Sequence, residues 1–301
     1  MYLNALTKGC AFPQEDFEAV VQSVFQPAVN LRPTRSKLLL TLSTSGEADL
    51  PQGVRVNSPA DFSFDQKLRI GEKASCQGKL LFFQDSSLVI DLNSASRWEC
   101  DLPALRGNIN NPTTAAAWDF AWQILNERQA RLGAELQAAA VLKLEDDTRN
   151  ETTKRAGKAI LALGIGAIQH WMSDYSFQAG VVGVVGLGPG LTPAGDDLLV
   201  GFLAGLWCTL RGREDCAKFL TRLGRAIIRA SKKTNDLSRT YIFQAARGQV
   251  SSRVEALARA ICSGEGEEQI RTAAEAAMQS GHSSGMDTVT GLLLGLRAWE
   301  R

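Results

Sequence analysis

The spacing of apolar residues changes about one third of the way along the chain. From about Gln26 to Leu102, apolar positions recur in short, period-two runs separated by turn residues, which is typical of β-strands. We expect strands at Ala28–Leu31, Lys37–Ser43, Gly53–Asn57, Lys79–Phe83, Leu88–Leu92 and Arg97–Asp101. Several short strands at this spacing predict a small, mostly antiparallel β-barrel or sandwich.

A segment rich in Pro, Gly and Asn at residues 102–112 interrupts this pattern, and helical periodicity follows it. We therefore predict an α+β protein, with a β-rich domain over residues 1–105 and a larger, mainly α-helical domain over residues 113–301. The expected helices are Thr114–Ala130, Gly133–Leu144, Ala159–Trp171, one directly after Asp197, Asp215–Lys232, Ser238–Arg247, Val254–Cys262, Glu267–Gln279 and a terminal helix to Glu300. The charged stretch from Glu145 to Lys158 indicates a solvated, mobile connection.

A glycine-rich loop stands out in the helical part. Residues 186–197 read Gly-Leu-Gly-Pro-Gly-Leu-Thr-Pro-Ala-Gly-Asp-Asp and lead straight into an apolar run. A shorter version recurs ninety residues later, because the spacing of one Asp and three Gly is the same in both. The matched positions are Gly195, Asp197, Gly201 and Gly205 in the first copy and Gly285, Asp287, Gly291 and Gly295 in the second.

Apolar residues at helical spacing follow each loop, and the glycines four apart leave a smooth stripe where another backbone can approach. Glycine costs a helix about 0.8–1 kcal/mol relative to alanine, so matched glycines indicate a packing role. We predict a buried helix pair that crosses at these glycines. Their preceding loops then converge on one pocket.

The first loop can bind a ligand in two ways. Backbone N–H groups at Gly188 and Gly190, with the Thr192 hydroxyl, are suited to a phosphate or carboxylate near a helix N-terminus. Asp196 and Asp197 instead suit an N–H donor, or a metal ion that lies between them and an anion. The spacing is neither a P-loop nor a dinucleotide fingerprint. The alternative is that each Asp only caps the helix.

The second loop places an imidazole, two hydroxyl groups and a carboxylate side by side, in His282, Ser283, Ser284 and Asp287. Histidine exchanges protons near neutral pH, and hydroxyl groups bind anions. Here too a cap at Ser284 or Asp287 remains an alternative. A third polar run, residues 234–241, can bring Asn235, Ser238 or Arg239 to the same pocket, although its residue types are also those that start helices.

Composition excludes several classes of protein. The chain has 33 basic and 32 acidic residues, so it has no electrostatic footprint for nucleic acid or an anionic membrane. Its apolar runs are shorter than a bilayer requires and its start lacks a signal-peptide design, so we expect a cytoplasmic protein. Six scattered cysteines and two histidines assemble no zinc site. We expect reduced core cysteines, no bound metal and no cofactor.

Three segments resemble the third (H) subunit family of bacterial oxamate carbamoyltransferase. They are residues 188–197, residues 238–248 (Ser-Arg-Thr-Tyr-Ile-Phe-Gln-Ala-Ala-Arg-Gly) and residues 281–288 (Gly-His-Ser-Ser-Gly-Met-Asp-Thr). The resemblance is specific over residues 181–297 and vague in the β-rich part. The family pattern has Ser-His where this chain has Ala194-Gly195, and Thr at Ser283, which leaves the substrate open.

This resemblance implies that the chain helps to convert oxalurate and phosphate into oxamate and carbamoyl phosphate in allantoin degradation. It also implies two partner subunits, one of the FdrA type and one uncharacterised. On this interpretation the loop at 188–192 holds the anion, Asp196 or Asp197 accepts from the NH2 group, and His282 transfers protons. The alternatives are a non-catalytic scaffold or regulatory subunit, and a Mg²⁺-dependent enzyme that uses Asp196 and Asp197.

Overall fold

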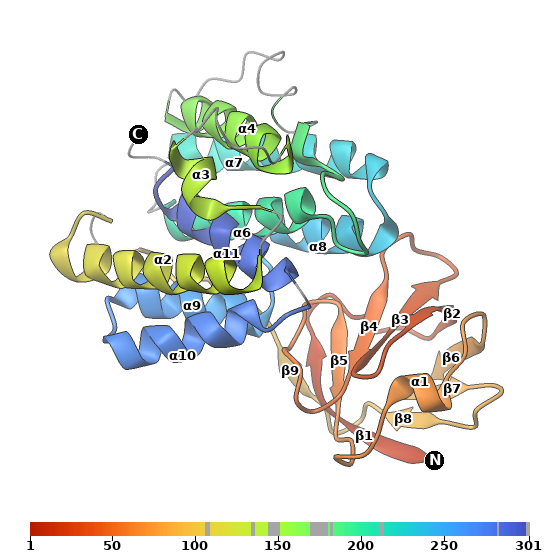
Figure 1. The fold of residues 1–301 in the computed structure, drawn as a ribbon. Helices are drawn as coiled ribbons and strands as arrows, with labels where there is room; N and C mark the ends of the chain where they lie inside the picture. Colours follow the sequence, from red (N-terminus) through yellow and green to blue (C-terminus); the bar gives the residue numbers. More distant parts are fainter. Residues whose placement is uncertain are drawn as a thin grey trace. The chain divides into compact units, whose positions relative to one another are not determined.

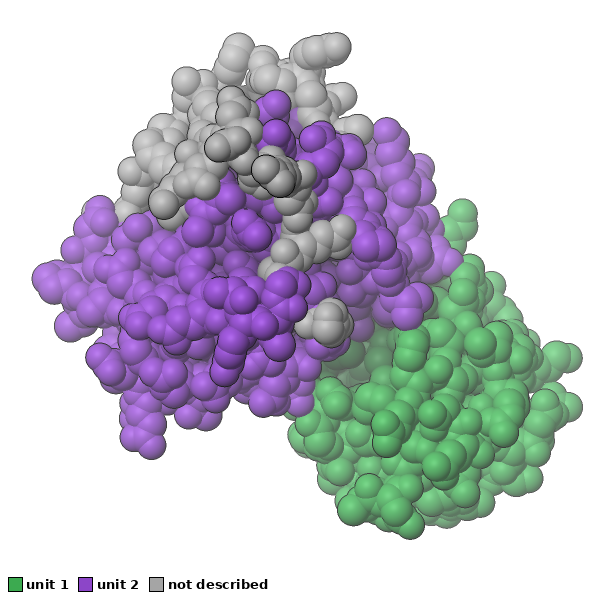
Figure 2. All heavy atoms as spheres, viewed as in Figure 1, with its two compact units in different colours: residues 1–100 green, residues 101–301 purple. Residues whose placement is uncertain are grey.

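The computed structural model describes residues 1–105, 109–133, 136–143, 151–168, 180, 183–210, 214–281 and 283–298. The chain divides into two compact units, Met1–Cys100 and Asp101–Arg301, which Figure 2 colours separately. The first unit is built from β-strands and the second from helices (Figure 1). The α+β class expected from the sequence is therefore confirmed.

The first unit is a closed barrel rather than a sandwich. Its nine-stranded sheet has the order β5-β4-β3-β2-β6-β7-β8-β1-β9, and β1 also pairs with β5, which closes the sheet. The strands are β1 Tyr2–Gly9, β2 Phe17–Val24, β3 Ala28–Pro33, β4 Leu40–Ser43, β5 Gly53–Val56, β6 Lys73–Gln77, β7 Leu80–Phe83, β8 Val89–Asp91 and β9 Ser96–Trp98, with one short helix, α1 Phe64–Lys67.

The strand β1 makes the closure possible because it pairs on both of its edges. It runs antiparallel to β5, with Ala5 opposite Val56, and parallel to β8, with Leu3 opposite Ile90. Its second half pairs with β9 in place of β8, with Lys8 opposite Arg97. The sequence pattern missed β1, β2 and β6, so placing the start of the β-rich pattern at Gln26 was wrong.

Alternate residues of the strands point into a common apolar core, as a half-buried sheet requires. Five of the best buried are Val29, Leu31, Leu42, Val56 and Ile90, each with no exposed surface. The tight turn from β6 to β7 places both central residues, Gly78 and Lys79, at positive φ, which is the geometry of a type I′ hairpin.

The second unit contains the described helices α2 Pro112–Leu132, α3 Ala138–Lys143, α4 Glu151–Ile168, α6 Ala194–Cys208, α7 Glu214–Ala230, α8 Asp236–Ala245, α9 Ser252–Ser263, α10 Glu267–Met278 and α11 Ser284–Leu296, and the 3₁₀ turn η1 Ser231–Lys233. Figure 1 shows α6 and α11 in the middle of the helical unit, with α4 and α7 drawn above them and α9 and α10 below. Both central helices are buried on nearly all sides.

The helix boundaries follow local signals. Asn111 caps α2 by accepting from the backbone N–H of Thr113, and Gly133 ends it in the left-handed conformation, as glycine after a helix commonly does. The expected mobile connection at Glu145–Lys158 was wrong in its second part, because residues 151–158 belong to α4. Residues 144–150, like Trp171 and Glu300 of the expected helices, lie outside the described residues.

Candidate functional site

The helices α6 and α11 pack backbone to backbone along their glycines. A Cβ atom on Gly201 would lie 1.8 Å from the carbonyl oxygen of Thr288, and one on Gly291 would lie 2.0 Å from the carbonyl oxygen of Leu198. Gly205 and Gly295 make the next contact along the seam. No side chain fits at these positions, so the predicted crossing of the two helices at their glycines is confirmed.

The contacts along this seam also give the direction of the two helices. Gly201 faces the backbone at Thr288 and Leu292, and Gly205, one turn further on, faces Leu292 and Leu296. Both helices therefore run the same way, and their N-terminal ends lie together. Figure 1 shows α6 and α11 side by side.

The carboxylates of Asp197 and Asp287 meet at this common end. Each occupies the same position of its repeat, and their exposed fractions are only 4% and 0%. Burial raises the pKa of Asp197 well above its ordinary value, and the negative charges of Asp287 and Asp196 act in the same direction, whereas the Ser284 and Thr192 hydroxyls lower it. Among the described residues, Asp197 Oδ2 has no hydrogen-bond partner. A hydrogen-bond donor from a ligand can satisfy it.

The neighbouring Asp196 is engaged by the protein itself. Its Oδ1 accepts from the backbone N–H of Gly186 at 2.8 Å, and its Oδ2 accepts from the Thr234 hydroxyl. Burial raises its pKa, and these hydrogen bonds, with the nearby Ser238 hydroxyl, partly offset that rise. Asp196 thus ties the loop before α6 to the segment before α8, and both of its oxygens are already used.

The aspartates at the start of α6 and α11 do not cap these helices. The N-cap position of α6 is Pro193 and that of α11 is Ser283, and neither makes a side-chain capping bond. The capping interpretation of Asp196, Asp197, Ser284 and Asp287 was therefore wrong. Their burial at the start of each helix needs another explanation.

The glycine loop is shaped by its backbone. Gly186, Gly188 and Gly190 all have positive φ, between 71° and 100°, a region that L side chains rarely adopt. Pro189, Gly190 and Leu191 are exposed at the tip, and Leu191 is 55% exposed. The N–H of Gly195 donates to Leu187 O at 2.8 Å, so the part of the loop open to an anion is its tip, together with the half-buried Thr192.

The start of α8 supports this loop. Asn235 caps α8 by accepting from the N–H groups of Leu237 and Ser238, and its own Nδ2 donates to Leu191 O at 2.8 Å. The helix-start interpretation of Asn235 is confirmed, and the same side chain also holds the loop tip. Ser238 is buried beside Asp196. Thr234, which the sequence analysis did not single out, donates to Asp196. Its position in the same polar run as Asn235 and Ser238 was the one feature of the sequence that could have identified it.

The start of α11 contributes Ser284 to the surroundings of Asp197, and Ser283 is half-buried before it. The N–H of Gly285 donates to Ser280 O at 2.8 Å, the counterpart of the Gly195 bond in the first repeat. His282 lies outside the described residues, as does His170. Among the residues that the structure describes, no group of three His, Cys, Asp or Glu side chains can hold a metal ion.

Most of the cysteines, and Trp118, belong to the interior of the protein. All six cysteines are free, and five of them are buried, as expected. Trp118 is buried and its indole N–H donates to Leu293 O at 2.9 Å, so it is a core residue, stacked on Trp122. Across the described residues, no helix combines the length and the apolar character needed to cross a membrane.

Fold and site together define a two-unit α+β protein in which a duplicated loop–helix unit presents two buried aspartates. Residues 184–296 match the family described as oxamate carbamoyltransferase subunit AllH, and residues 4–97 match the AllH family N-terminal domain. The chain therefore belongs to the AllH family, and as a member of a subunit family it has partner subunits. Neither the curated proteins nor the solved structures include a match to it.

Proposed function

We propose that this chain is the subunit of a cytoplasmic carbamoyltransferase that holds a small anionic substrate at the loop 186–197, in allantoin degradation. The reaction is the transfer of a carbamoyl group between oxalurate and phosphate, which yields oxamate and carbamoyl phosphate. An FdrA-like subunit and a second, uncharacterised subunit complete the complex. The membership of the AllH family supports the reaction class, and the site supports the place of binding.

The observation that carries the proposal is the open oxygen of Asp197. A buried carboxylate oxygen without a partner among the described residues is costly unless a donor reaches it. Carbamoyl phosphate, oxamate and oxalurate each carry an NH2 group that can donate, and an anionic end that can accept hydrogen bonds from the N–H groups at Gly188 and Gly190. A loop that combines both features suits these ligands.

Within this proposal the two neighbouring carboxylates have different roles. Asp196 is a positioning residue, because its oxygens bind Gly186 and Thr234. Asp197, with its raised pKa, is suited to a proton transfer. When a phosphate oxygen attacks the carbamoyl carbon of oxalurate and the C–N bond breaks, the proton of hydrogen phosphate must reach the leaving nitrogen. Asp197, assisted by His282, carries that proton.

The other candidate residues surround this centre. Ser284, Thr192 and Asp287 contribute to the electrostatic environment of Asp197, and we propose that they contact the substrate together with Ser283. Asn235 and Ser238 act from α8, the first through the loop tip at Leu191 and the second beside Asp196. Orientation and charge stabilisation then supply most of the rate enhancement.

Calorimetric titration of the isolated chain with carbamoyl phosphate, phosphate, oxamate and oxalurate tests the proposal. We expect saturable binding that Asp197→Asn abolishes while circular dichroism remains unchanged. The matched control is Asp215→Asn, which removes an exposed carboxylate at the start of α7 and should bind as the wild type does.

The reconstituted complex distinguishes the alternatives. If no ligand binds the isolated chain and the complex with Asp197→Asn retains full turnover, the chain is a scaffold and the proposal fails. If a chelator abolishes turnover, and Mg²⁺ restores it in proportion to the Mg²⁺ bound at Asp197, the alternative of a metal-dependent enzyme is correct instead.

A further inference from the structure

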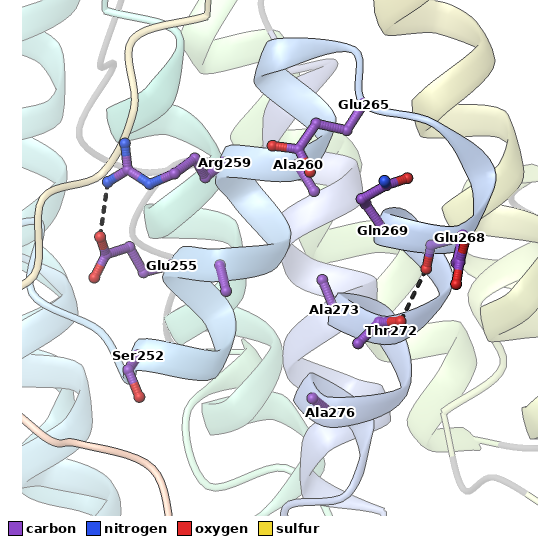
Figure 3. A pocket seen from close by; sticks show the side chains of 11 residues that line it. Ser252, Glu255, Arg259, Ala260, Glu265, Glu268, Gln269, Thr272, Ala273 and Ala276 are labelled. Atoms are coloured by element: carbon purple, nitrogen blue, oxygen red, sulfur yellow. Dashed lines mark hydrogen bonds and ion pairs between the residues drawn. The ribbon is translucent and has the colours of Figure 1, made fainter.

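A long groove runs along the helical hairpin of α9 and α10, away from the glycine loops in the sequence. Its volume is about 710 Å³, and Figure 3 shows the side chains that line it. The floor is made of small residues, Ala256, Ala260, Ala273 and Ala276. The lining residues run from Ser252 to Ala260 on α9 and from Glu268 to Ala276 on α10, so the groove is about 12 Å long at 1.5 Å per residue, enough for two turns of another helix.

The charges around this groove are mostly negative. Three glutamates line it, Glu255, Glu265 and Glu268, against one arginine, Arg259. Figure 3 shows Arg259 turned to Glu255, with which it forms an ion pair of 2.8 Å, and Arg259 also donates to the Asp101 carbonyl oxygen at 2.6 Å. The end of the groove at Glu265 and Glu268 therefore has an excess of negative charge.

The same chain exposes a helix face of opposite charge. On α7, Lys218, Arg222, Arg225 and Arg229 are all exposed, and their spacing of four, three and four residues places them along one face. Lys218 forms an ion pair of 2.7 Å with Glu214, so the net positive charge of this face comes from the three arginines. The opposite face of α7 is apolar and buried, with Phe219, Leu220, Leu223 and Ile227 among its residues. Packing of α7 against its own unit therefore leaves the basic face towards solvent.

We propose that the groove between α9 and α10 of one copy of this chain receives the basic face of α7 from a second copy. The alanine floor leaves room for the long aliphatic stems of Arg222, Arg225 and Arg229, which can cover apolar surface while their guanidinium groups reach the rim. Glu265 and Glu268 then face guanidinium groups and fix the register.

This contact joins two different surfaces, so it is heterologous and continues from copy to copy in a ring or an open chain. Its charge pairs lie at the rim, where they contribute mainly specificity and are screened by salt. The association is therefore weak and sensitive to ionic strength.

Sedimentation velocity of the full chain tests the proposal, at about 100 µM protein and at about 0.02 M and about 0.5 M salt. We expect self-association at low salt that is lost at high salt. The double variant Glu265→Lys/Glu268→Lys and the double variant Arg225→Glu/Arg229→Glu should each weaken it by at least about tenfold. The control Glu15→Lys/Glu18→Lys makes the same change of net charge as the groove variant, on exposed residues of the barrel, and should associate as the wild type does.

Mixing the two double variants gives the sharpest test. Each variant alone has like charges on its groove and its α7 face, whereas in a one-to-one mixture each groove meets an α7 face of opposite charge, so the mixture should recover the association that both variants lose. A wild type that stays monomeric at low salt, a groove variant that associates as the wild type does, or a mixture that stays monomeric would overturn the proposal. A monomeric wild type whose groove variant fails to bind the partner subunits would assign the groove to a partner instead.

Discussion

Gly201 of α6 and Thr288 of α11 approach so closely that a single methyl group on the glycine would lie 1.8 Å from the threonine carbonyl oxygen. The obstacle is backbone on a buried helix, which cannot turn aside as a flexible side chain can. The contact at Gly291 and Leu198 repeats this arrangement in the second half of the duplicated unit. The stability of the central helix pair therefore depends on having glycine, which has no side chain, at these positions.

Gly201→Ala should destabilise the protein strongly. The added methyl group must force α6 and α11 apart, and we expect a loss of at least about 3 kcal/mol in the free energy of unfolding. Chemical denaturation followed by circular dichroism measures it. In Gly183→Ala, where a Cβ would meet nothing within 4 Å, stability should stay the same or rise by up to about 1 kcal/mol. Equal effects of the two substitutions would contradict the close packing.

Asp197→Asn should stabilise the protein, and the gain should grow with pH. Burial raises the pKa of Asp197 in the folded chain, so between the unfolded and folded pKa values the folded chain holds more protons, and wild-type stability falls as pH rises. The amide does not ionise. The difference in melting temperature should be smallest near about pH 4 and reach its full size above the folded pKa.

Asp61→Asn is the control for this pH series, because Asp61 is exposed in the first unit. Its melting temperature should follow the wild type throughout. A difference for Asp197→Asn that shrinks towards alkaline pH would show that the folded carboxylate is stabilised by its surroundings, contrary to the burial seen here.

Thr234→Val should loosen the glycine loop. The valine keeps the shape but removes the hydroxyl that donates to the buried Asp196, and a hydrogen bond to a charged group is worth about 1.5–3 kcal/mol. Thermal unfolding and proteolysis at the loop tip measure the effect. The control Thr221→Val removes an exposed hydroxyl that bonds only to Ala217 O within its own helix and should change stability by less than about 0.5 kcal/mol.

The fragment 1–105 should fold by itself, which is the proposed boundary of the first domain. The apolar cluster of the barrel comes entirely from residues between Leu3 and Leu92, and a domain with its own core can fold alone. We expect a cooperative melting transition and a β-type circular dichroism spectrum. The same fragment with Val29→Asp, a charge placed in that core, should be unfolded, and a wild-type fragment without a transition would refute the boundary.

The sequence predicted the helix pair because the matched glycines of each copy lie within one short segment, where a local pattern can be recognised. It missed β1 and β2, although Leu3 and Ala5, like Ala19 and Val21, alternate as buried residues. The reason is that β1 finds its partners β5, β8 and β9 at distances in sequence that no local pattern reports. Closure of the barrel therefore could not be predicted.

The structure distinguishes two candidate site residues that the sequence could not. Two adjacent carboxylates, Asp196 and Asp197, are equivalent in sequence, and only the fold separates the one bound by Thr234 and Gly186 from the one with an open oxygen. The helix turn between them rotates the two side chains by about 100°, so one points to α8 and the other to α11. The roles of these residues depend on packing that a motif does not encode.

The glycine seam has a consequence for binding. Since α6 and α11 touch along their backbones, Asp197 and Asp287 cannot move apart without disrupting the core of the helical unit. A ligand at the proposed site would therefore meet a preorganised pair of carboxylates, whose ordering entropy was already lost when the chain folded. Binding there would lose less free energy to ordering the protein, and the four glycines of the seam, which carry no functional group, would contribute to affinity through rigidity alone.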